Sequence, residues 1–274
     1  MSAHAPLLDM NGIVTPHANA CCTPTTGLVI VCCHAVCEDA PSTVKEDSWR
    51  LQSFQRSDAR TGKPGEHETF LLHILAAAMI YSHRPSALVM FSGGQTTDSE
   101  LSEAKSYEQV LGSFMTLQDN QSRLGQRVAL EEHATDSYQN LLFSILRFRR
   151  LVGRYPETVT VITHAFKERR FFDLHAAAIK WPRSRLRVQG VSPPFTLDEL
   201  EQTQRSELKR GYKLFAKDLY GVQSPLSDKR TARNWDPRVM QGLAVESEVE
   251  QLLRWTGGES GTDIYPGTLP WEPQ

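Results

Sequence analysis

Two adjacent glycines after a short apolar run are the first indication of a ligand site in this sequence. Ser92-Gly93-Gly94 places two residues without a Cβ after a predicted strand, so the backbone can turn tightly and direct its amides toward a ligand. The following helix is predicted to open at Thr97, with Glu100 completing a capping box. A strand, a glycine turn and a helix N-terminus together suit a phosphate or carboxylate, although a plain tight turn explains the glycines equally well.

A second set of candidate residues follows another predicted strand. Lys167 and Arg170 are three residues apart and share a face near the start of a helix. Cations at that end oppose the helix dipole, and a bound anion would offset the cost, which favours a ligand role over a random basic face. Thr163 and His164 end the strand, and His164 is either a general acid–base group or a turn histidine bonded to backbone.

Acidic and amide side chains complete the candidate site. Glu131 ends a third predicted strand and points either into the crevice or into the sheet. Glu103 is either a solvated acid stabilised by the helix dipole or a crevice group that binds a hydroxyl or amine. Ser137, Asn140 and Ser144 form a polar stripe on the next helix, and such a stripe ordinarily faces solvent.

Metal chemistry and the common hydrolase motifs find little support. The sequence contains no G-x-S-x-G, H-E-x-x-H or paired C-x-x-C motif. A metal site built from His34, Glu103, Glu131 and His164 is a weaker hypothesis, because no two of them have local chelating spacing, and we predict no metal. The cysteines are odd in number and confined to the N-terminal part, which favours structural packing over disulfides: Cys21, Cys22, Cys32, Cys33 and Cys37.

The elements that must position these residues alternate between strands and helices. Short apolar runs predict strands at 27–33, 87–91, 127–131, 158–163 and 186–191. Three- and four-residue periodicity predicts helices between them, at 70–79, 101–114, 138–152 (capped by Thr135) and 166–179. This alternation predicts an α/β fold, a Rossmann-like three-layer sandwich with a mostly parallel sheet of about five strands. The candidate residues follow strand ends, where ligands of such sheets bind.

Three regions of the chain are expected. Residues 1–26 are predicted to be a flexible leader, and residues 27–195 a Rossmann-like domain. Residues 196–274 are predicted to be a helical and irregular extension packed on the same domain. An insertion at 38–65, with a short helix near 49–54, is expected to hang over the strand ends, where lids sit.

Composition excludes several classes of protein. The 274 residues are 40% hydrophobic and 23% charged, which rules out wholesale disorder. A formal net charge of −2 gives no sign of a nucleic-acid partner. No apolar run approaches the roughly 20 residues that span a bilayer, and no secretory signal is evident, so we expect a cytoplasmic protein.

In four ordered blocks the chain resembles the YdcF-like proteins, a family of domains of unknown function that includes the SanA and ElyC types. The blocks are the apolar run 27–33; Phe91-Ser92-Gly93-Gly94 with Ser102-Glu103-Ala104; Glu131, Ser137 and Asn140; and Thr163, Phe166 and Arg170 in a T-x-x-F-x-x-x-R pattern. The likeness covers about residues 27–192, and the inserted segments resemble the fungal branch of that family. Lys167 stands where the family often has histidine.

The resemblance implies a Rossmann-like sandwich with a crevice for a nucleotide-like ligand, and it suggests S-adenosylmethionine as one such ligand. Our leading hypothesis is a small-molecule-binding α/β enzyme that takes an anionic or nucleotide-like ligand at the strand ends. Glu131 or His164 would supply acid–base chemistry, and the expected ligand-binding residues are Ser92, Gly93, Gly94, Glu103, Ser137, Asn140, Thr163, Lys167 and Arg170. The alternatives are a phosphoester hydrolase or transferase, and a non-catalytic regulatory or scaffold protein.

Overall fold

A five-stranded, all-parallel sheet forms the centre of the computed structural model, which describes residues 24–115 and 127–273. The strands are β1 (Gly27–Cys32), β4 (Ala87–Ser92), β5 (Val128–Glu131), β6 (Thr158–His164) and β7 (Leu186–Val191). They lie in the order β5-β4-β1-β6-β7. The predicted α/β fold is therefore confirmed, and each of the five predicted runs forms a strand within one or two residues of its expected bounds.

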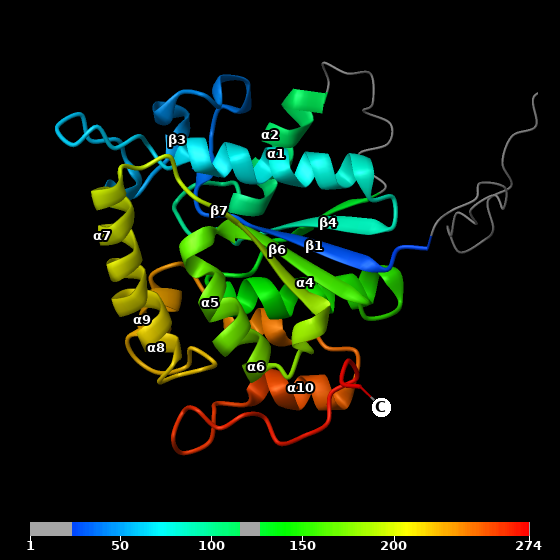
Figure 1. Ribbon diagram of the computed structural model, residues 1–274. Coiled ribbons are helices and arrows are strands. Elements are labelled where there is room, and N and C mark those ends of the chain that lie inside the picture. The colour runs from blue at the N-terminus through cyan, green and yellow to red at the C-terminus, as the bar shows by residue number, and fades with distance from the viewer. Residues whose placement is uncertain (1–23, 116–126, 274) are drawn as a thin grey trace, which may run out of the picture.

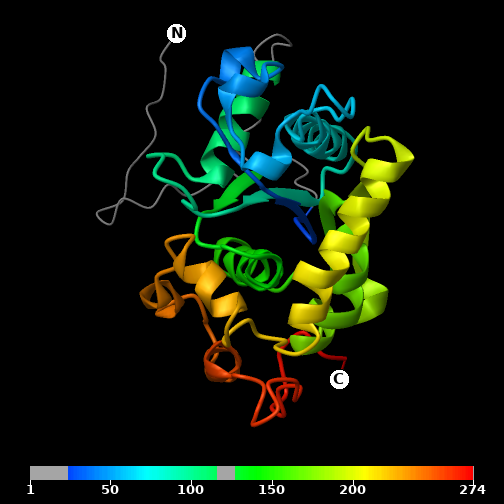
Figure 2. The same ribbon diagram turned by 90° about the vertical axis from the view of Figure 1, so that its left-hand side faces the viewer.

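Two helical layers enclose the sheet (Figure 1 and Figure 2). On one side lie α1 (His67–His83) and α2 (Glu103–Met115), and on the other α4 (Ser137–Val152). Alternate residues of β1 divide between the two cores: Val29 and Val31 pack toward α1 and α2, whereas Leu28 and Ile30 pack toward α4. Burial on both faces is why the strand residues read as a continuous apolar run rather than an alternating one.

The fourth predicted helix is not continuous. A 3-10 turn at Ala165–Lys167, α5 (Glu168–Arg170), a π turn at Phe171–His175 and α6 (Ala176–Ala178) replace it. A π turn inserts an extra residue per turn, and such insertions often occur at functional sites. The segment ends before Trp181-Pro182, as expected for a proline stop.

The insertion after the first strand contains a small hairpin and short 3-10 turns, one of them at Ser53–Gln55, rather than an α-helix. Strands β2 (Val36–Cys37) and β3 (Trp49–Arg50) pair antiparallel, so the predicted helix near 49–54 is wrong. Trp49 is buried, and its ring centroid lies 5.8 Å from that of Phe70 and 5.7 Å from that of Tyr107. This tertiary packing overrides the weak local helical pattern.

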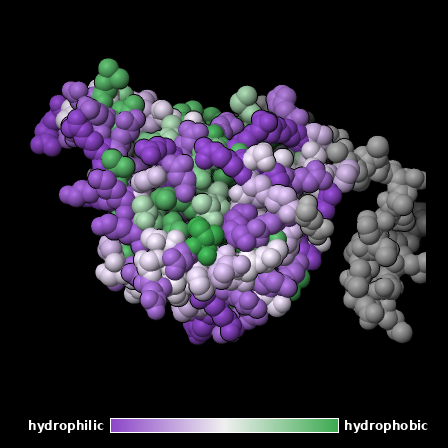
Figure 3. Space-filling view, turned by 60° about the horizontal axis from the view of Figure 1, so that its bottom comes forward, coloured by the Kyte–Doolittle hydropathy of each residue, from purple (hydrophilic) through white to green (hydrophobic). Residues whose placement is uncertain are grey.

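Much of the C-terminal region packs on the α4 side of the sheet. It contains α7 (Leu197–Glu207), a π turn at Leu208–Tyr212, α8 (Lys213–Phe215), α9 (Leu226–Thr231) and α10 (Ser247–Arg254). Tyr220, Leu252 and Trp271 of this region belong to the same buried cluster as Phe148. When the bottom of the molecule is tipped forward, hydrophobic residues gather near the centre of a largely hydrophilic face (Figure 3).

Residues 1–23 of the predicted leader lie outside the described residues, as do Cys21 and Cys22. The three cysteines that are described, Cys32, Cys33 and Cys37, are buried and unbridged, as packing residues should be. Within residues 24–115 and 127–273, no helix combines the length and the apolar character needed to cross a membrane.

Candidate functional site

The backbone amides of the glycine turn after β4 are hydrogen-bonded to another segment of the chain and are not free to bind an anion. Gly93 N donates to Glu131 O at 3.0 Å, and Gly94 N donates to Ala134 O at 2.7 Å. Glu103 N, at the start of α2, donates back to Gly94 O at 3.0 Å. Both amides are occupied by the loop after β5, so the predicted anion cradle at Gly93 and Gly94 is wrong.

The start of α2 also differs from the prediction. The helix begins at Glu103 rather than near Thr97, and its cap is Ser102, whose Oγ accepts from Lys105 N at 2.9 Å. The predicted capping box of Thr97 and Glu100 is therefore absent. Asn234 Nδ2, in the C-terminal region, donates to Thr97 O at 3.2 Å and helps to hold this segment in a non-helical conformation.

A close approach at Gly93 leads to a testable prediction. A Cβ at this position would lie 2.8 Å from Glu103 Oε2 and 2.9 Å from Cys33 Cβ, distances that normal packing does not allow. Gly93→Val should therefore destabilise the protein by about 1–3 kcal/mol in urea unfolding. The matched control is Gly112→Ala in α2, where an added Cβ meets no described atom within 4 Å. It should stabilise the helix by roughly 0.5–1 kcal/mol. Equal stability of the Gly93→Val variant and the unmodified protein would contradict the packing argument.

Ser92, Glu131 and Asn140 form one buried polar network across β4, β5 and α4. Ser92 Oγ donates to Glu131 Oε2 at 2.5 Å, and Asn140 Nδ2 donates to Ser92 Oγ at 2.9 Å. Glu131 Oε1 accepts from the amides of His133 and Ala134 at 2.8 and 3.1 Å. Burial raises the pKa of Glu131 to about 7, although these hydrogen bonds act in the opposite direction. Both carboxyl oxygens are thus engaged, and Glu131 holds the β5 loop in place.

The polar stripe of α4 faces inward. Ser137, Asn140 and Ser144 are all buried, so the expectation of a solvent-facing stripe is wrong. Two of its members meet polar partners from neighbouring elements: Ser137 Oγ lies 2.7 Å from His175 Nε2, and Asn140 Nδ2 donates to Ser92 Oγ. Ser144 Oγ has no hydrogen-bond partner within the described chain. The helix cap is Asp136 rather than Thr135, because the Asp136 side chain accepts from Gln139 N at 2.9 Å.

Glu103 is buried at the crevice side of α2 rather than solvated. Its side chain is near Gly93, and Thr96 Oγ1 donates to Glu103 Oε1 at 2.5 Å. Burial raises the pKa of Glu103, whereas the hydrogen bond from Thr96 and the charges of Arg233 and Lys167 lower it. Of the two alternatives for Glu103, the solvated acid at the helix N-terminus is therefore wrong.

Three imidazoles cluster at the carboxyl ends of β1 and β6. The ring centroid of His164 lies 4.7 Å from that of His34 and 5.1 Å from that of His73. His164 is buried and neither ring nitrogen has a hydrogen-bond partner within the described chain, so it is not a turn histidine bonded to backbone. Burial and then the charge of Lys167 lower the pKa values of all three rings, that of His73 to about 3. All three are consequently neutral at pH 7.

The predicted cations lie beside this cluster. Lys167 Nζ lies 3.4 Å from His34 Nδ1, and Thr163 Oγ1 lies 3.5 Å from His34 Nε2. Arg170 pairs with Glu207 of α7 at 3.3 Å. Burial, and next the charge of Arg170, lower the pKa of Lys167 to about 8, although Glu207 and Glu66 act in the opposite direction. Lys167 makes no ion pair with any residue in the described ranges.

Three residues near the imidazole cluster were not identified as candidate site residues from the sequence. Glu66 Oε2 lies 3.6 Å from His164 Nε2, His73 belongs to the imidazole cluster, and Glu207 pairs with Arg170. His73 carries a usable signal, since it interrupts the apolar stripe of α1 between Phe70 and Ala77. No sequence pattern identifies Glu207, because its position beside Arg170 depends on how α7 packs.

Metal binding finds no support in the geometry. No group of three or more His, Cys, Asp or Glu residues within residues 24–115 and 127–273 is arranged to hold a metal ion. Of the four residues weighed for such a site, the two carboxylates are engaged elsewhere, Glu131 with Ser92 and Glu103 with Thr96.

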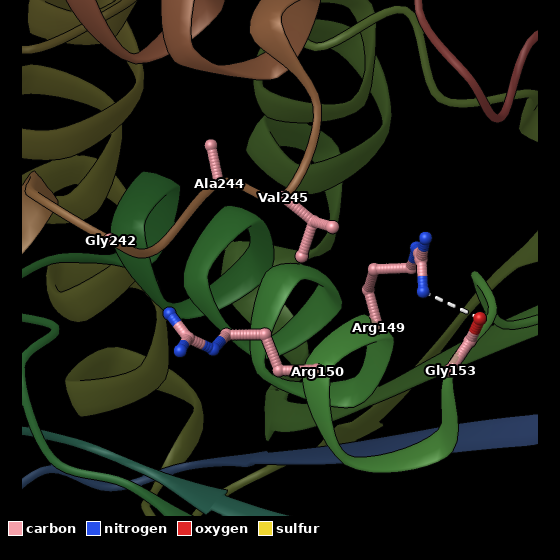
Figure 4. Close-up of a pocket in the computed structure, with 6 residues that line it drawn as sticks. All are labelled: Arg149, Arg150, Gly153, Gly242, Ala244 and Val245. Atoms are coloured by element: carbon pink, nitrogen blue, oxygen red, sulfur yellow. Dashed lines mark hydrogen bonds between the residues drawn. The ribbon is translucent and has the colours of Figure 1, made fainter.

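An open cavity of about 440 Å³ lies away from these residues, between the end of α4 and the segment 242–245 (Figure 4). Arg149 and Arg150 line it, and Arg149 Nη1 donates to Gly153 O at 2.5 Å. Cations at a helix C-terminus are favoured by the dipole, so this arrangement needs no ligand to explain it.

Comparison with known proteins yields one informative relative. The chain is 28% identical, over 251 aligned residues, to the uncharacterized protein YOR238W of Saccharomyces cerevisiae. The alignment covers 76% of this chain and 83% of the yeast protein. No protein-family model matches the chain. No solved structure matches it either.

Proposed function

We propose that this protein binds a small anionic molecule, a phosphate ester or a carboxylate, beside Lys167 at the carboxyl edge of β1 and β6. The observation that carries the proposal is the burial of Lys167 without an ion-pair partner in the described chain. Its ammonium is half-buried and close to Arg170, yet its one recorded hydrogen bond within the described chain is to a neutral imidazole, His34. A partly desolvated cation without a counter-charge is unfavourable, and an anionic ligand would supply that charge.

The surrounding charges support this choice of ligand. Arg170 is paired with Glu207 and the three imidazoles are neutral, so Lys167 carries a positive charge that no carboxylate contacts directly in the described chain, although the charges of Glu207 and Glu66 raise its pKa. Burial raises the pKa of Glu66, the other nearby carboxyl, although the charges of Lys167 and Lys63 lower it. Location also supports the proposal, because β1 lies where the strand order reverses, between β4 and β6. Ligands of open α/β sheets bind at such a switch point.

The resemblance to YdcF-like proteins makes a nucleotide the first ligand class to examine, and S-adenosylmethionine the second. In each case Lys167 would face the anionic group, a phosphate or the amino-acid carboxylate. Glu103 would contact the polar remainder, whereas Thr163 is buried and would position His34, whose Nε2 lies 3.5 Å from Thr163 Oγ1. Ser92, Glu131, Ser137 and Asn140 would position the strand ends and α4 without touching the ligand, since their hydrogen bonds are internal.

A second candidate is a phosphoester hydrolase or transferase, and the feature that favours it is His34. This imidazole is half-buried, neutral at pH 7 and 3.4 Å from Lys167 Nζ, so it can accept a proton next to a bound phosphate. His164 and Glu131 are less suitable, because both are almost completely buried and both carboxyl oxygens of Glu131 are already hydrogen-bonded.

The pH dependence of anion binding tests the proposal. AMP is fully ionised above pH 7, since the second phosphate pKa is about 6, so any change above pH 7 reports the protein. Because the pKa of Lys167 is about 8, binding measured by calorimetry should weaken only about twofold from pH 7 to 8. It should then weaken by up to about tenfold per pH unit.

The matched control is Lys167→Arg, which keeps its charge throughout and should bind AMP equally well from pH 7 to 10. Wild-type affinity that stays constant to pH 10 would contradict the role of Lys167. Phosphate released from AMP in the same samples would support the second candidate if His34→Asn abolishes the release. Binding without release favours a binding protein.

A further inference from the structure

A second cavity, of about 230 Å³, lies between the N-terminal half of α4 and the C-terminal region, apart from the imidazole cluster. Figure 2 shows the orange segment of the C-terminal region beside α4. Aromatic rings form much of the cavity wall: Phe143, Tyr220, Trp235 and Trp255. Phe143 and Trp235 stack at 5.6 Å, one from α4 and the other from the segment after α9, which holds the two sides together. A cavity below about 300 Å³ accommodates one ring system rather than a drug-sized molecule.

Three polar groups that line this cavity have hydrogen-bonding capacity left over. Arg230 is 7% exposed, and its Nη2 has no partner within the described chain. Its Nε is bonded to Asp136 Oδ2 at 2.6 Å. The Tyr138 hydroxyl and Gln139 Nε2 make no hydrogen bond within the described ranges either, but unlike Arg230 Nη2 these two atoms are not completely enclosed. Buried donors without acceptors are costly, and native proteins contain few of them.

The charges of the residues at the cavity indicate the charge of its ligand. Arg230 is the one charged residue among those that line the described cavity, and its charge is balanced by Asp136 in a buried ion pair. An anionic ligand would compete with Asp136 for the Arg230 guanidinium, and a cationic one would be repelled by the guanidinium without offering it an acceptor. An uncharged ring with an acceptor on its edge suits both the aromatic walls and the unsatisfied donors.

We propose that this cavity is a binding site for an uncharged aromatic or heteroaromatic ring that carries a hydrogen-bond acceptor. The ring packs between the aromatic walls, and its acceptor receives hydrogen bonds from Arg230 Nη2 and the Tyr138 hydroxyl. The site shares no residue with the Lys167 cluster, so it stands or falls independently of the function proposed above.

Three probes of one shape and different charge test the proposal on the full chain: benzamide, benzoate and benzamidine. Trp235 and Trp255 line the cavity, so binding is measured by tryptophan fluorescence and checked by saturation-transfer NMR. Benzamide should bind, and benzoate and benzamidine should bind at least about tenfold more weakly, a difference of about 1.4 kcal/mol. Absence of benzamide binding, or equal binding of all three, would overturn the proposal.

Two variants locate the binding without disturbing the buried ion pair. Ser227→Phe places a ring at the cavity wall and should abolish benzamide binding, whereas Ser206→Phe, on the exposed face of α7, should leave it unchanged. Tyr138→Phe keeps the ring, removes the hydroxyl and should weaken binding roughly fivefold. Identical affinities for the Ser227→Phe and Ser206→Phe variants would place the ligand elsewhere and refute the assignment.

Discussion

Replacing Asp136 with alanine should destabilise the protein by about 3–5 kcal/mol, the largest stability loss we expect from a single polar substitution. Asp136 does two things at once: it caps α4 through Gln139 N and it balances Arg230, whose Nε lies 2.6 Å from Asp136 Oδ2. Both side chains are nearly buried, with 12% and 9% of their surfaces exposed. Removal of Asp136 leaves a buried guanidinium without a counter-charge and a helix without its cap, and chemical unfolding in urea measures the loss.

Two comparisons separate this effect from a nonspecific one. Asp198→Ala, in the first turn of the exposed helix α7, should cost less than about 1 kcal/mol. A double variant, Asp136→Asn with Arg230→Met, should recover much of the loss, because it removes both charges and retains a capping side chain. A double variant as unstable as Asp136→Ala would show that the ion pair is not the source of the effect.

Acid should produce the same loss in the unmodified protein. Burial opposes ionisation of Asp136, but Arg230 and the Gln139 amide prevail and lower its pKa below the ordinary value of 3.8. A carboxyl with a depressed folded pKa contributes its full stability above the unfolded pKa and loses it as the pH falls through the folded pKa. The Asp136 contribution is therefore complete at neutral pH, begins to fall near the unfolded pKa of about 4, and is lost only as the pH drops through the lower folded pKa.

Replacing Lys167 with methionine should abolish AMP binding, at least about a hundredfold, while making the unliganded protein more stable. The pKa of Lys167 falls from 10.5 to about 8 on folding. Between these values the unfolded state binds more protons than the folded state, so stability rises with pH in this window. The charged ammonium therefore costs stability at pH 7, and its removal should raise the free energy of unfolding by about 2 kcal/mol.

Opposite changes in binding and stability distinguish a functional cation from a structural one. Lys217→Met is the matched control, since Lys217 is exposed and lies outside the imidazole cluster. It should leave both AMP affinity and urea stability within about 0.5 kcal/mol of the unmodified protein. If Lys167→Met destabilises the protein or binds AMP normally, Lys167 does not belong to an anion site.

Much of the candidate site could be predicted because it follows strand ends. Ser92, Glu131 and Thr163 each lie at the carboxyl end of an apolar run, and parallel strands bring those ends to one edge. The structure confirms that Ser92 and Glu131 are in contact, and that Thr163 and Lys167 both approach His34. The orientation of individual groups was not predictable in this way, because it depends on partners distant in the sequence.

The glycine turn illustrates the difference. Gly93 and Gly94 have the local properties of an anion-binding loop, yet their amides donate to Glu131 and Ala134 on the neighbouring strand's loop. Likewise the Ser137–Asn140 stripe has the pattern of a solvated face, but β4 and the 171–175 turn supply polar partners that allow its burial. A polar residue can be buried wherever the fold provides a partner, and local pattern does not contain that information.

Sequence alone determined that this chain forms a parallel sheet between helical layers and that its polar residues collect at one edge. Both follow from hydrophobic periodicity and strand direction, which are properties of short segments. Only the tertiary structure decided which groups are engaged in internal hydrogen bonds and ion pairs and which are not. Lys167 makes no ion pair within the described residues, whereas Glu207, 37 positions beyond Arg170, pairs with Arg170. Competition among such long-range partners is settled only when the chain is packed.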